Sequence, residues 1–249
     1  MINKPLLCFF IVFAYLSSRA FGQTVAADDS TMQKIAIGHV VDAYNTSIGQ
    51  MSRLYNGPEY EFYDPIIKGN AFFLDVNEFK SGTVNYDGIY YSNVPMIYDI
   101  NKDLVVTLLY NGFSKYSLLN SRIQSFDLLN HHFVYIEADS TNLASSISSG
   151  IYEEVYSGKL QVLIRWTKSI QSISTQTTLE TFFTEAKKHY YLKKGSNYYS
   201  VGGQSAFLNV LKDKKKELQQ YIKANKIKFK DNPEKVMYLI AAQYDQLSK

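Results

Sequence analysis

Residues 83–91 read Thr-Val-Asn-Tyr-Asp-Gly-Ile-Tyr-Tyr, and this stretch decides the fold class. The β-branched and aromatic residues on both sides favour extended strands, and Asp87-Gly88 between them favours a two-residue turn. Both central positions of such a turn take positive φ, which Asp and Gly accept more readily than bulkier residues. The stretch therefore predicts a β-hairpin, and with it an antiparallel sheet.

Outward from this hairpin, the same pattern of short apolar runs between turn residues recurs along the chain. The further predicted strands are 71–76, 94–100, 104–109, 122–128, 133–137, 151–156, 159–168, 189–193 and 198–201. Pro95 has no backbone N–H, so its strand is expected to lie at a sheet edge or to begin there. Hairpins in succession indicate an antiparallel β-meander rather than a parallel sheet. The pattern leaves open whether the sheet is open, strongly curved or a half-barrel.

Helices are predicted on both sides of the β-rich body. Apolar residues at helical spacing predict an N-terminal helix over 31–54, and Asn56-Gly57-Pro58 ends it. Two amphipathic helices are predicted in the helical tail, 204–249. The second begins at Asn232-Pro233-Glu234, which combines an N-cap, a proline in the first turn and an acid at the positive end of the helix dipole. Its apolar stripe is expected to pack on the sheet.

These elements predict a single α+β domain over residues 23–249, with the β-rich body at 70–201. The first 22 residues have the features of a signal peptide. Lys4 is followed by an apolar run from Leu6 to Leu16, and Ala20 and Gly22 are the small residues expected before a cut at Gln23. The run is shorter than the ~20 residues of a membrane helix. We therefore expect an exported protein of the periplasm, cell envelope or extracellular space, with no transmembrane segment after the signal peptide.

Several kinds of chemistry are excluded by the composition. Cys8 is the only cysteine and lies in the predicted signal peptide, so the mature chain has no disulfide, thiolate nucleophile or cysteine-bound metal. The sequence has no glycine-rich phosphate loop, no Gly-x-Ser-x-Gly and no His-Glu-x-x-His. We expect no cofactor, no metal site and no nucleic-acid partner.

Charge is unevenly distributed. The whole chain has a net charge of +3, whereas residues 204–249 hold ten lysines against five acidic residues. Such a basic tail can contact an anionic polymer or a membrane surface, and it can equally be the solvated face of a helix.

Acidic, amide and aromatic side chains are concentrated where the first helix gives way to the sheet. Aromatic rings stack on sugars, and acids and amides form hydrogen bonds with hydroxyl groups, so this region is a candidate surface for a glycan or a peptide. The predicted binding residues are Asn56, Glu59, Tyr60, Asp64, Tyr98 and Asp99. The alternative is that Asn56-Gly57-Pro58 only turns the chain and the tyrosines anchor it to the core. No catalytic residue is predicted.

Four segments in this order resemble an uncharacterised family of exported bacterial proteins. They are Leu54-Tyr55-Asn56-Gly57-Pro58-Glu59-Tyr60, Gly82-x-Val84-x-Tyr86-Asp87-Gly88, Val94-Pro95 with Tyr98-Asp99, and Lys214-Lys215-Lys216-Glu217-Leu218. The resemblance covers about residues 50–249. It implies export and a single domain, and it implies no activity.

Three functions remain as hypotheses. The favoured one is a non-catalytic envelope module that binds a partner protein or a glycan. The second is a carrier that holds a lipid-like apolar ligand in a curved sheet. The third is a glycoside hydrolase, which needs two carboxyl groups that face one bond. Its candidate acids are Glu59, Glu61, Asp64, Asp87, Asp99 and Asp103, although Asp87 and Asp103 are also common turn formers.

Overall fold

The computed structural model describes residues 29–48, 53–109, 111–139, 141, 146–174 and 176–248. The predicted signal peptide and the predicted domain start at residue 23 lie outside the described residues. The chain divides into two compact units, residues 1–41 and 42–249, and the second contains the sheet and the C-terminal helices. The helix predicted over 31–54 overlaps α2, Asp29–Ile48, while Arg53–Tyr55 forms the separate 3-10 turn η2.

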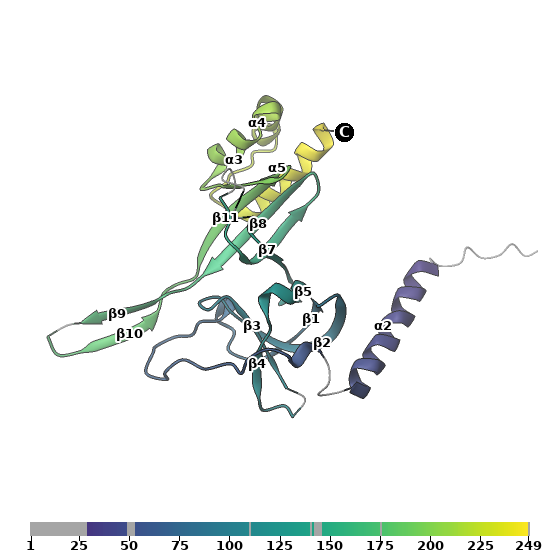
Figure 1. The fold of residues 1–249 in the computed structure, drawn as a ribbon. Helices are drawn as coiled ribbons and strands as arrows, with labels where there is room; N and C mark the ends of the chain where they lie inside the picture. The colour runs from purple at the N-terminus through teal and green to yellow at the C-terminus, as the bar shows by residue number, and fades with distance from the viewer. Residues whose placement is uncertain are drawn as a thin grey trace, which may run out of the picture. The chain divides into compact units, whose positions relative to one another are not determined.

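The second unit is built on a ten-stranded antiparallel sheet, so the predicted α+β class with an antiparallel sheet is confirmed (Figure 1). The strand order is β12-β11-β8-β7-β6-β5-β1-β2-β3-β4. The strands are β1 (Lys80–Tyr86), β2 (Ile89–Asp99), β3 (Leu104–Leu108), β4 (Lys115–Ser117), β5 (Ile123–Leu128), β6 (His131–Ile136), β7 (Gly150–Ser157), β8 (Leu160–Thr167), β11 (Lys187–Lys194) and β12 (Asn197–Ser200). From β1 one meander runs to β4, and β5 then pairs with the other side of β1 and starts a second meander.

The hairpin predicted at Asp87-Gly88 is confirmed. β1 and β2 pair on either side of these residues, whose φ angles are 54° and 75°. The turn between β5 and β6, which lies between the predicted strands 122–128 and 133–137, uses Leu129 and Asn130 at φ 54° and 64°. These turns are defined by local backbone preferences, which is why the sequence locates them well.

The strand predicted over 71–76 is wrong. Phe72 makes one isolated bridge to Asp99, and Phe73–Asp75 forms the 3-10 turn η3. The ring of Phe73 inserts edge-on between aromatic side chains of the sheet, with its centroid 4.9 Å from that of Trp166. Burial of this ring in the core outweighs the strand preference of the apolar run.

Pro95 lies inside the sheet, so its predicted place at an edge or at a strand start is wrong. β2 runs through Pro95 and has β1 and β3 on its two sides. The carbonyl of Pro95 accepts a hydrogen bond from the Thr107 hydroxyl at 2.9 Å, so its missing N–H also faces β3. Pairing with β3 begins only at Met96. Proline at this position therefore removes no backbone hydrogen bond between β2 and β3.

The sheet is neither closed nor strongly curled, so the strongly curved and half-barrel forms are wrong. β12 and β4 stand at its two ends. β4 has only three residues, and the chain before Tyr60 covers its outer edge, where the N–H of Tyr60 donates to the Lys115 carbonyl at 2.8 Å. A short and covered edge offers no ladder with which β12 could close the sheet.

A cluster of aromatic rings fills one face of the sheet. Phe126 and Phe133 stack at a centroid distance of 4.7 Å, and Tyr98 packs edge-on against both. Phe73 and Trp166 complete this buried cluster. The large apolar area of these rings is a main source of the stability of this part of the unit.

The C-terminal helices cover a second core. They are α3 (Gln204–Val210), α4 (Lys215–Ala224) and α5 (Pro233–Leu247). α5 begins as predicted, because the Asn232 side chain accepts from the Lys235 N–H at 2.9 Å. Its apolar stripe packs on Leu160 and Val162 of β8, so the predicted contact with the sheet is confirmed. Across the described residues, no helix has both the length and the apolar character needed to span a membrane.

Candidate binding surface

The predicted binding segment is anchored to a buried carboxylate. Asp99 at the end of β2 is fully buried. Its Oδ2 accepts the hydroxyl protons of Tyr60 and Tyr63 at 2.8 and 2.9 Å, and its Oδ1 accepts the N–H groups of Asn101 and Lys102, each at 2.9 Å. Every side-chain oxygen of Asp99 is thus bonded to the protein, as a buried carboxylate requires.

Lys102 holds the same segment from outside. Its Nζ lies 4.8 Å from the ring centre of Tyr60 and 4.4 Å from that of Tyr63, and it donates to the Glu61 carbonyl at 2.6 Å. These cation–π contacts attract the ammonium group to the faces of both rings. The segment between Tyr60 and Tyr63 is therefore fixed in place, and Phe62 between them remains 56% exposed.

The structure brings together some of the predicted residues and separates others. Tyr60 and Asp99 meet as described. Tyr98 is also buried, but its hydroxyl donates to Asp103 at 2.8 Å, because neighbouring residues on a strand point to opposite faces. Asn56, Glu59 and Asp64 are exposed, and the Asp64 side chain accepts from the Ile66 N–H at 2.9 Å. Tyr60, Tyr98 and Asp99 thus belong to the interior. This agrees with the alternative interpretation, in which the tyrosines anchor the chain to the core. The binding assignment itself stays a prediction.

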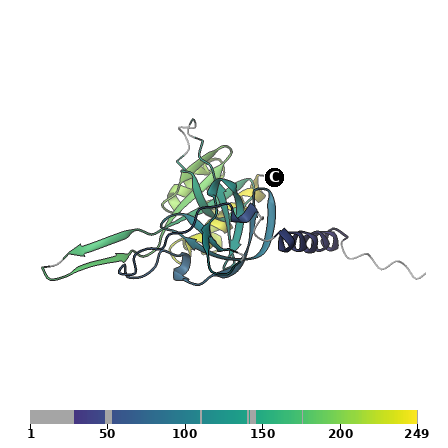
Figure 2. The ribbon, with the colours of Figure 1, turned by 60° about the horizontal axis from the view of Figure 1, so that its bottom comes forward.

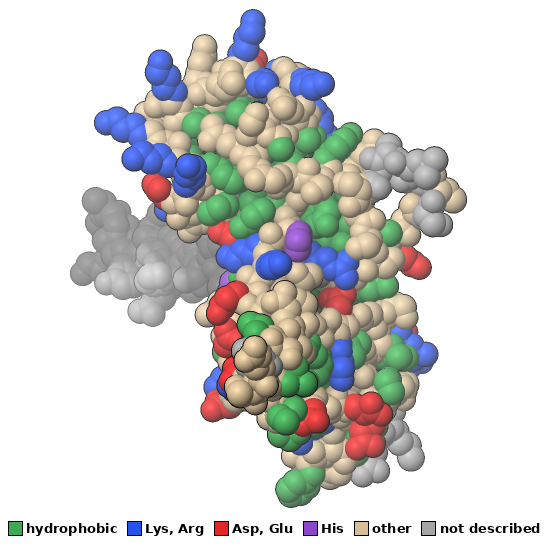
Figure 3. Space-filling model, turned by 90° about the vertical axis from the view of Figure 1, so that its left-hand side faces the viewer, with side chains coloured by type: hydrophobic (Ala, Val, Ile, Leu, Met, Phe, Trp, Pro, Cys, Tyr) green, Lys and Arg blue, Asp and Glu red, His purple; other side chains and the backbone are tan. Residues whose placement is uncertain are grey.

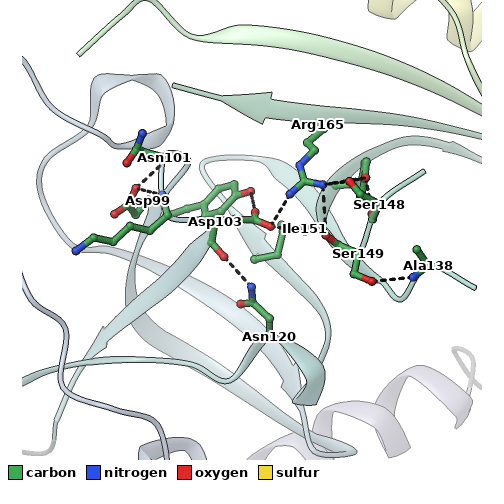
Figure 4. Close-up of polar contacts among 12 residues, drawn as sticks. Asp99, Asn101, Asp103, Asn120, Ala138, Ser148, Ser149, Ile151 and Arg165 are labelled. Carbon is green, nitrogen blue, oxygen red and sulfur yellow. Dashed lines mark hydrogen bonds and ion pairs between the residues drawn. The ribbon is translucent and has the colours of Figure 1, made fainter. Parts of the chain in front are cut away.

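A second, partly buried network centres on Asp103 and Arg165 (Figure 4). The two side chains point toward one another from the β2–β3 turn and from β8, and Arg165 Nη2 lies 3.2 Å from Asp103 Oδ2. The same oxygen accepts the Ile151 N–H at 3.2 Å. Arg165 Nη1 donates to the Tyr152 hydroxyl at 3.2 Å and to the Ser149 carbonyl at 3.3 Å. This network joins the first meander to the second.

Burial raises the pKa of Asp103 above its usual value, while the bonds from Tyr98 and the charge of Arg165 act in the opposite direction. At the base of the network, Gly150 has φ 156°, and a Cβ there would lie 2.6 Å from Asp103 Oδ2. Only glycine fits this position. The close packing leaves the carboxylate engaged with its own protein, which favours a structural role over acid–base chemistry.

Glu153 on β7 is, like Asp99, a buried carboxylate that is fully engaged. Its Oε2 accepts the indole N–H of Trp166 at 2.7 Å, and its Oε1 lies 2.6 Å from Nδ1 of His131. Within the described residues, no three His, Cys, Asp or Glu side chains are grouped as metal ligands would be. The space bounded by Phe73, Met96 and Tyr98 is filled and leaves no volume for a water molecule.

An arm that the sequence pattern did not reveal projects from the second unit. It consists of β9 (Ile170–Ser174) and β10 (Leu179–Phe183), which pair with each other as a two-stranded sheet. Both ribbon views show it extending away from the ten-stranded sheet (Figures 1 and 2). Its signal in the sequence is weak: residues 170–174 read Ile-Gln-Ser-Ile-Ser, a polar turn follows, and residues 179–183 read Leu-Glu-Thr-Phe-Phe.

The base of the arm is attached to the chain that follows the predicted binding residue Asp64. The Lys68 N–H donates to the Thr181 carbonyl at 2.9 Å, and the Phe183 N–H donates back to the Lys68 carbonyl at 3.0 Å. The ring of Phe183 packs edge-on against Tyr63 at 4.9 Å. The two regions share exposed apolar side chains, and we call this set the arm surface: Phe62, Ile66, Ile170, Ile173 and Leu179.

Comparison with protein-family models, with curated proteins and with solved structures gave no match. The function must therefore be argued from the geometry of the chain.

The buried tyrosines predict a steep loss of stability at alkaline pH. Burial, and next the charge of Asp99, raise the pKa of Tyr60 and of Tyr63 far above 10. Burial and a hydrogen bond to Asp245 raise the pKa of Tyr156 to about 12. Because these folded-state pKa values are raised, the stability that the groups contribute is complete below pH 10 and is lost as the pH rises through the folded values.

We therefore expect tyrosinate absorbance to develop in two phases. Exposed tyrosines ionise first, and the buried ones ionise together with the loss of the β-sheet circular dichroism signal. Tyr63→Phe serves as a control, because it should reduce the amplitude of the tyrosinate absorbance in the second phase only. A single phase near pH 10 with the sheet signal intact would show that the hydroxyl groups reach solvent in the folded protein.

Proposed function

We propose that this protein is an exported, non-catalytic module that binds an extended segment of a partner protein along the outer edge of β9. The observation that carries the proposal is the unguarded edge of the arm. In a two-stranded sheet, every second N–H and C=O of a strand points away from its neighbour and is available to an added strand. Among the described residues, β10 is the one strand paired with β9.

The sequence of the arm lacks the features that protect sheet edges. Residues 169–179 contain no charged residue and no proline, although natural proteins commonly place Lys or Pro at exposed edges to prevent pairing. Ile173 and Leu179 are 56% and 71% exposed. An added strand would cover them, and the apolar area so buried would add to the backbone hydrogen bonds.

The described geometry favours a protein over the other ligands considered. The hydroxyl groups of Tyr60 and Tyr98, expected to face a glycan, are committed to Asp99 and Asp103. The aromatic rings described above fill the space in which a carrier would hold an apolar ligand. Asp99, Asp103 and Glu153 accept bonds from the protein itself, which gives a hydrolase less support. Export rests on residues 1–22 of the sequence and is part of the proposal, as is membership of the exported family.

The test uses a random peptide library displayed on phage and selected against the mature protein. We expect peptides that bind as extended strands. Methylation of backbone nitrogens along a selected peptide should abolish binding at every second position, because only alternate N–H groups face β9. Ile173→Lys places a charge beside the edge and should weaken binding at least tenfold.

The matched control is Phe113→Lys, which makes a similar change at a side chain that is 82% exposed in the β3–β4 turn. It should bind the peptides as the parent does. A library that yields no binder, or binders that ignore Ile173→Lys, would overturn the proposal. So would sedimentation that shows two copies joined through the arm, since the occupant would then be a second copy of this chain.

A further inference from the structure

The hydrogen bonds at the base of the arm show which backbone groups of β9 face outward. The Thr184 N–H donates to the Ser169 carbonyl at 2.8 Å. The register of β9 and β10, continued by one step, places these two residues opposite each other. In an antiparallel pair, hydrogen-bonded positions alternate with positions whose N–H and C=O point away from the partner. The backbone groups of Ile170, Ser172 and Ser174 therefore point away from β10.

The other edge of the arm gives the same alternation independently. On β10, the Thr181 carbonyl accepts from the Lys68 N–H at 2.9 Å, and the Phe183 N–H donates to the Lys68 carbonyl at 3.0 Å. Thr181 and Phe183 therefore point their backbone groups away from β9. They lie opposite Ser172 and Ile170, and the two members of such a pair point outward at opposite edges. Two separate sets of hydrogen bonds thus assign the same residues of β9 to its outer edge.

Lys168 marks the inner end of this edge. Its N–H donates to the Ile100 carbonyl at 3.3 Å, and its carbonyl accepts from the Asn101 side chain at 2.9 Å. These bonds engage the backbone of Lys168 at the point where the arm joins the ten-stranded sheet. An added strand can therefore pair with β9 from Ile170 outward, over three alternate residues that end at Ser174.

Ile173 is the side chain on which an added strand packs most closely. By the same alternation its own backbone groups face β10. An added antiparallel strand therefore meets it at a non-hydrogen-bonded position, where Cα atoms are about 4.5 Å apart rather than about 5.5 Å. The side chain is more than half exposed, and an apolar β-branched or aromatic residue of the partner covers it best. In Figure 3 the arm points toward the viewer, and hydrophobic side chains show there between uncharged polar ones.

Serine residues lie on the face of β9 opposite that of Ile173. Ser172 and Ser174 share this face with Ile170, because alternate residues of a strand point to the same side. The Ser172 hydroxyl lies 3.0 Å from the hydroxyl of Thr181 on β10. A Thr or Ser of the partner opposite Ser172 extends this pair of hydroxyl groups by one strand. Ile170 is exposed at the base of the same face, and an apolar residue opposite it buries apolar area on both strands.

We propose that the partner segment runs antiparallel to β9 and carries five residues in the order any residue, apolar, Thr or Ser, any residue, apolar. In that order the five positions lie opposite Ser174, Ile173, Ser172, Gln171 and Ile170. The antiparallel direction is favoured because antiparallel pairing is slightly more stable per residue than parallel pairing. The pattern rests on the proposed function, since it specifies the strand that β9 receives.

The test sequences the peptides that the phage library yields and measures the affinity of a synthetic copy of one of them. We expect the enriched residues to follow this order from the N-terminus to the C-terminus. Asp at the position opposite Ile173 should weaken binding at least tenfold, whereas Asp at the position opposite Gln171 should change it less than threefold. Binders in which the order is reversed or absent overturn the pattern and leave the proposed function standing, because backbone pairing holds a strand of any sequence. A library without binders overturns both.

Ser172→Pro tests the orientation of the β9 backbone from the side of the protein. Proline removes an N–H that points to the outer edge and no hydrogen bond to β10, so peptide binding should fall at least tenfold while the arm stays paired. Hydrogen exchange of the Glu180 and Phe182 amides, which face β9, measures that pairing. Gln171→Pro is the matched control, because it removes an N–H that faces β10 and should abolish the protection of both amides. Full peptide binding by Ser172→Pro, or loss of protection in Ser172→Pro but not in Gln171→Pro, would show that the edges of β9 are assigned the wrong way round.

Discussion

Ile240→Asp is expected to lower the free energy of unfolding by about 4 kcal/mol, the largest effect of any single change considered. Ile240 lies on the inner face of α5 and is fully buried. It belongs to the core that α5 forms with β8, which contains Leu160 and Val162. The side chains of this core are hydrophobic, so the desolvation of a carboxylate there is not compensated. Chemical denaturation followed by circular dichroism measures the change.

Lys235→Asp is the matched control. It introduces the same carboxylate in the same helix, at an exposed position in the first turn. An acid in that turn is favoured by the helix dipole, so the free energy of unfolding should change by less than about 0.5 kcal/mol. An unchanged unfolding midpoint for Ile240→Asp would mean that the inner face of α5 is open to solvent.

Arg165→Leu is expected to cost about 3 kcal/mol, because it leaves the partly buried Asp103 carboxylate without its cation. Arg165 also donates to the Tyr152 and Ser148 hydroxyl groups and to the Ser149 carbonyl, so four partners lose a donor. The effect should depend on pH. The pKa of Asp103 is already raised by burial, and loss of the cation raises it further. Protonated Asp103 needs no cation, so the deficit should shrink as the pH falls through that raised value.

The double variant Asp103→Asn/Arg165→Leu distinguishes this explanation from simple loss of packing. Asparagine keeps the shape of the side chain and tolerates φ 57°. If the unpaired charge is the cause, the double variant should be more stable than Arg165→Leu alone. If instead the two single losses add, the carboxylate and the guanidinium contribute independently, and the network does not act as a unit.

The candidate site shows where sequence reasoning reaches its limit. The density of acidic and aromatic residues around Tyr60 and Asp99 indicated that these residues lie together. The two side chains do form a hydrogen bond, although they are 39 positions apart in the chain. The signal did not distinguish a recognition surface from an internal anchor, because burial depends on what the rest of the chain places over these residues. The arm was missed because its strands carry exposed hydroxyl residues rather than the strict apolar alternation of a half-buried strand.

The sequence by itself determined the features that depend on a few neighbouring residues. Asp87-Gly88 specified a hairpin through its φ preferences, and Asn232-Pro233 specified the start of α5 through its cap. Tertiary structure decided what depends on distant partners. Phe73 lies in a 3-10 turn rather than in the predicted strand, because its ring packs among the aromatic side chains of the core. Asp103 pairs with Arg165, which lies 62 positions further along the chain. Local backbone energies are encoded in local sequence, whereas burial and long-range pairing are properties of the packed chain as a whole.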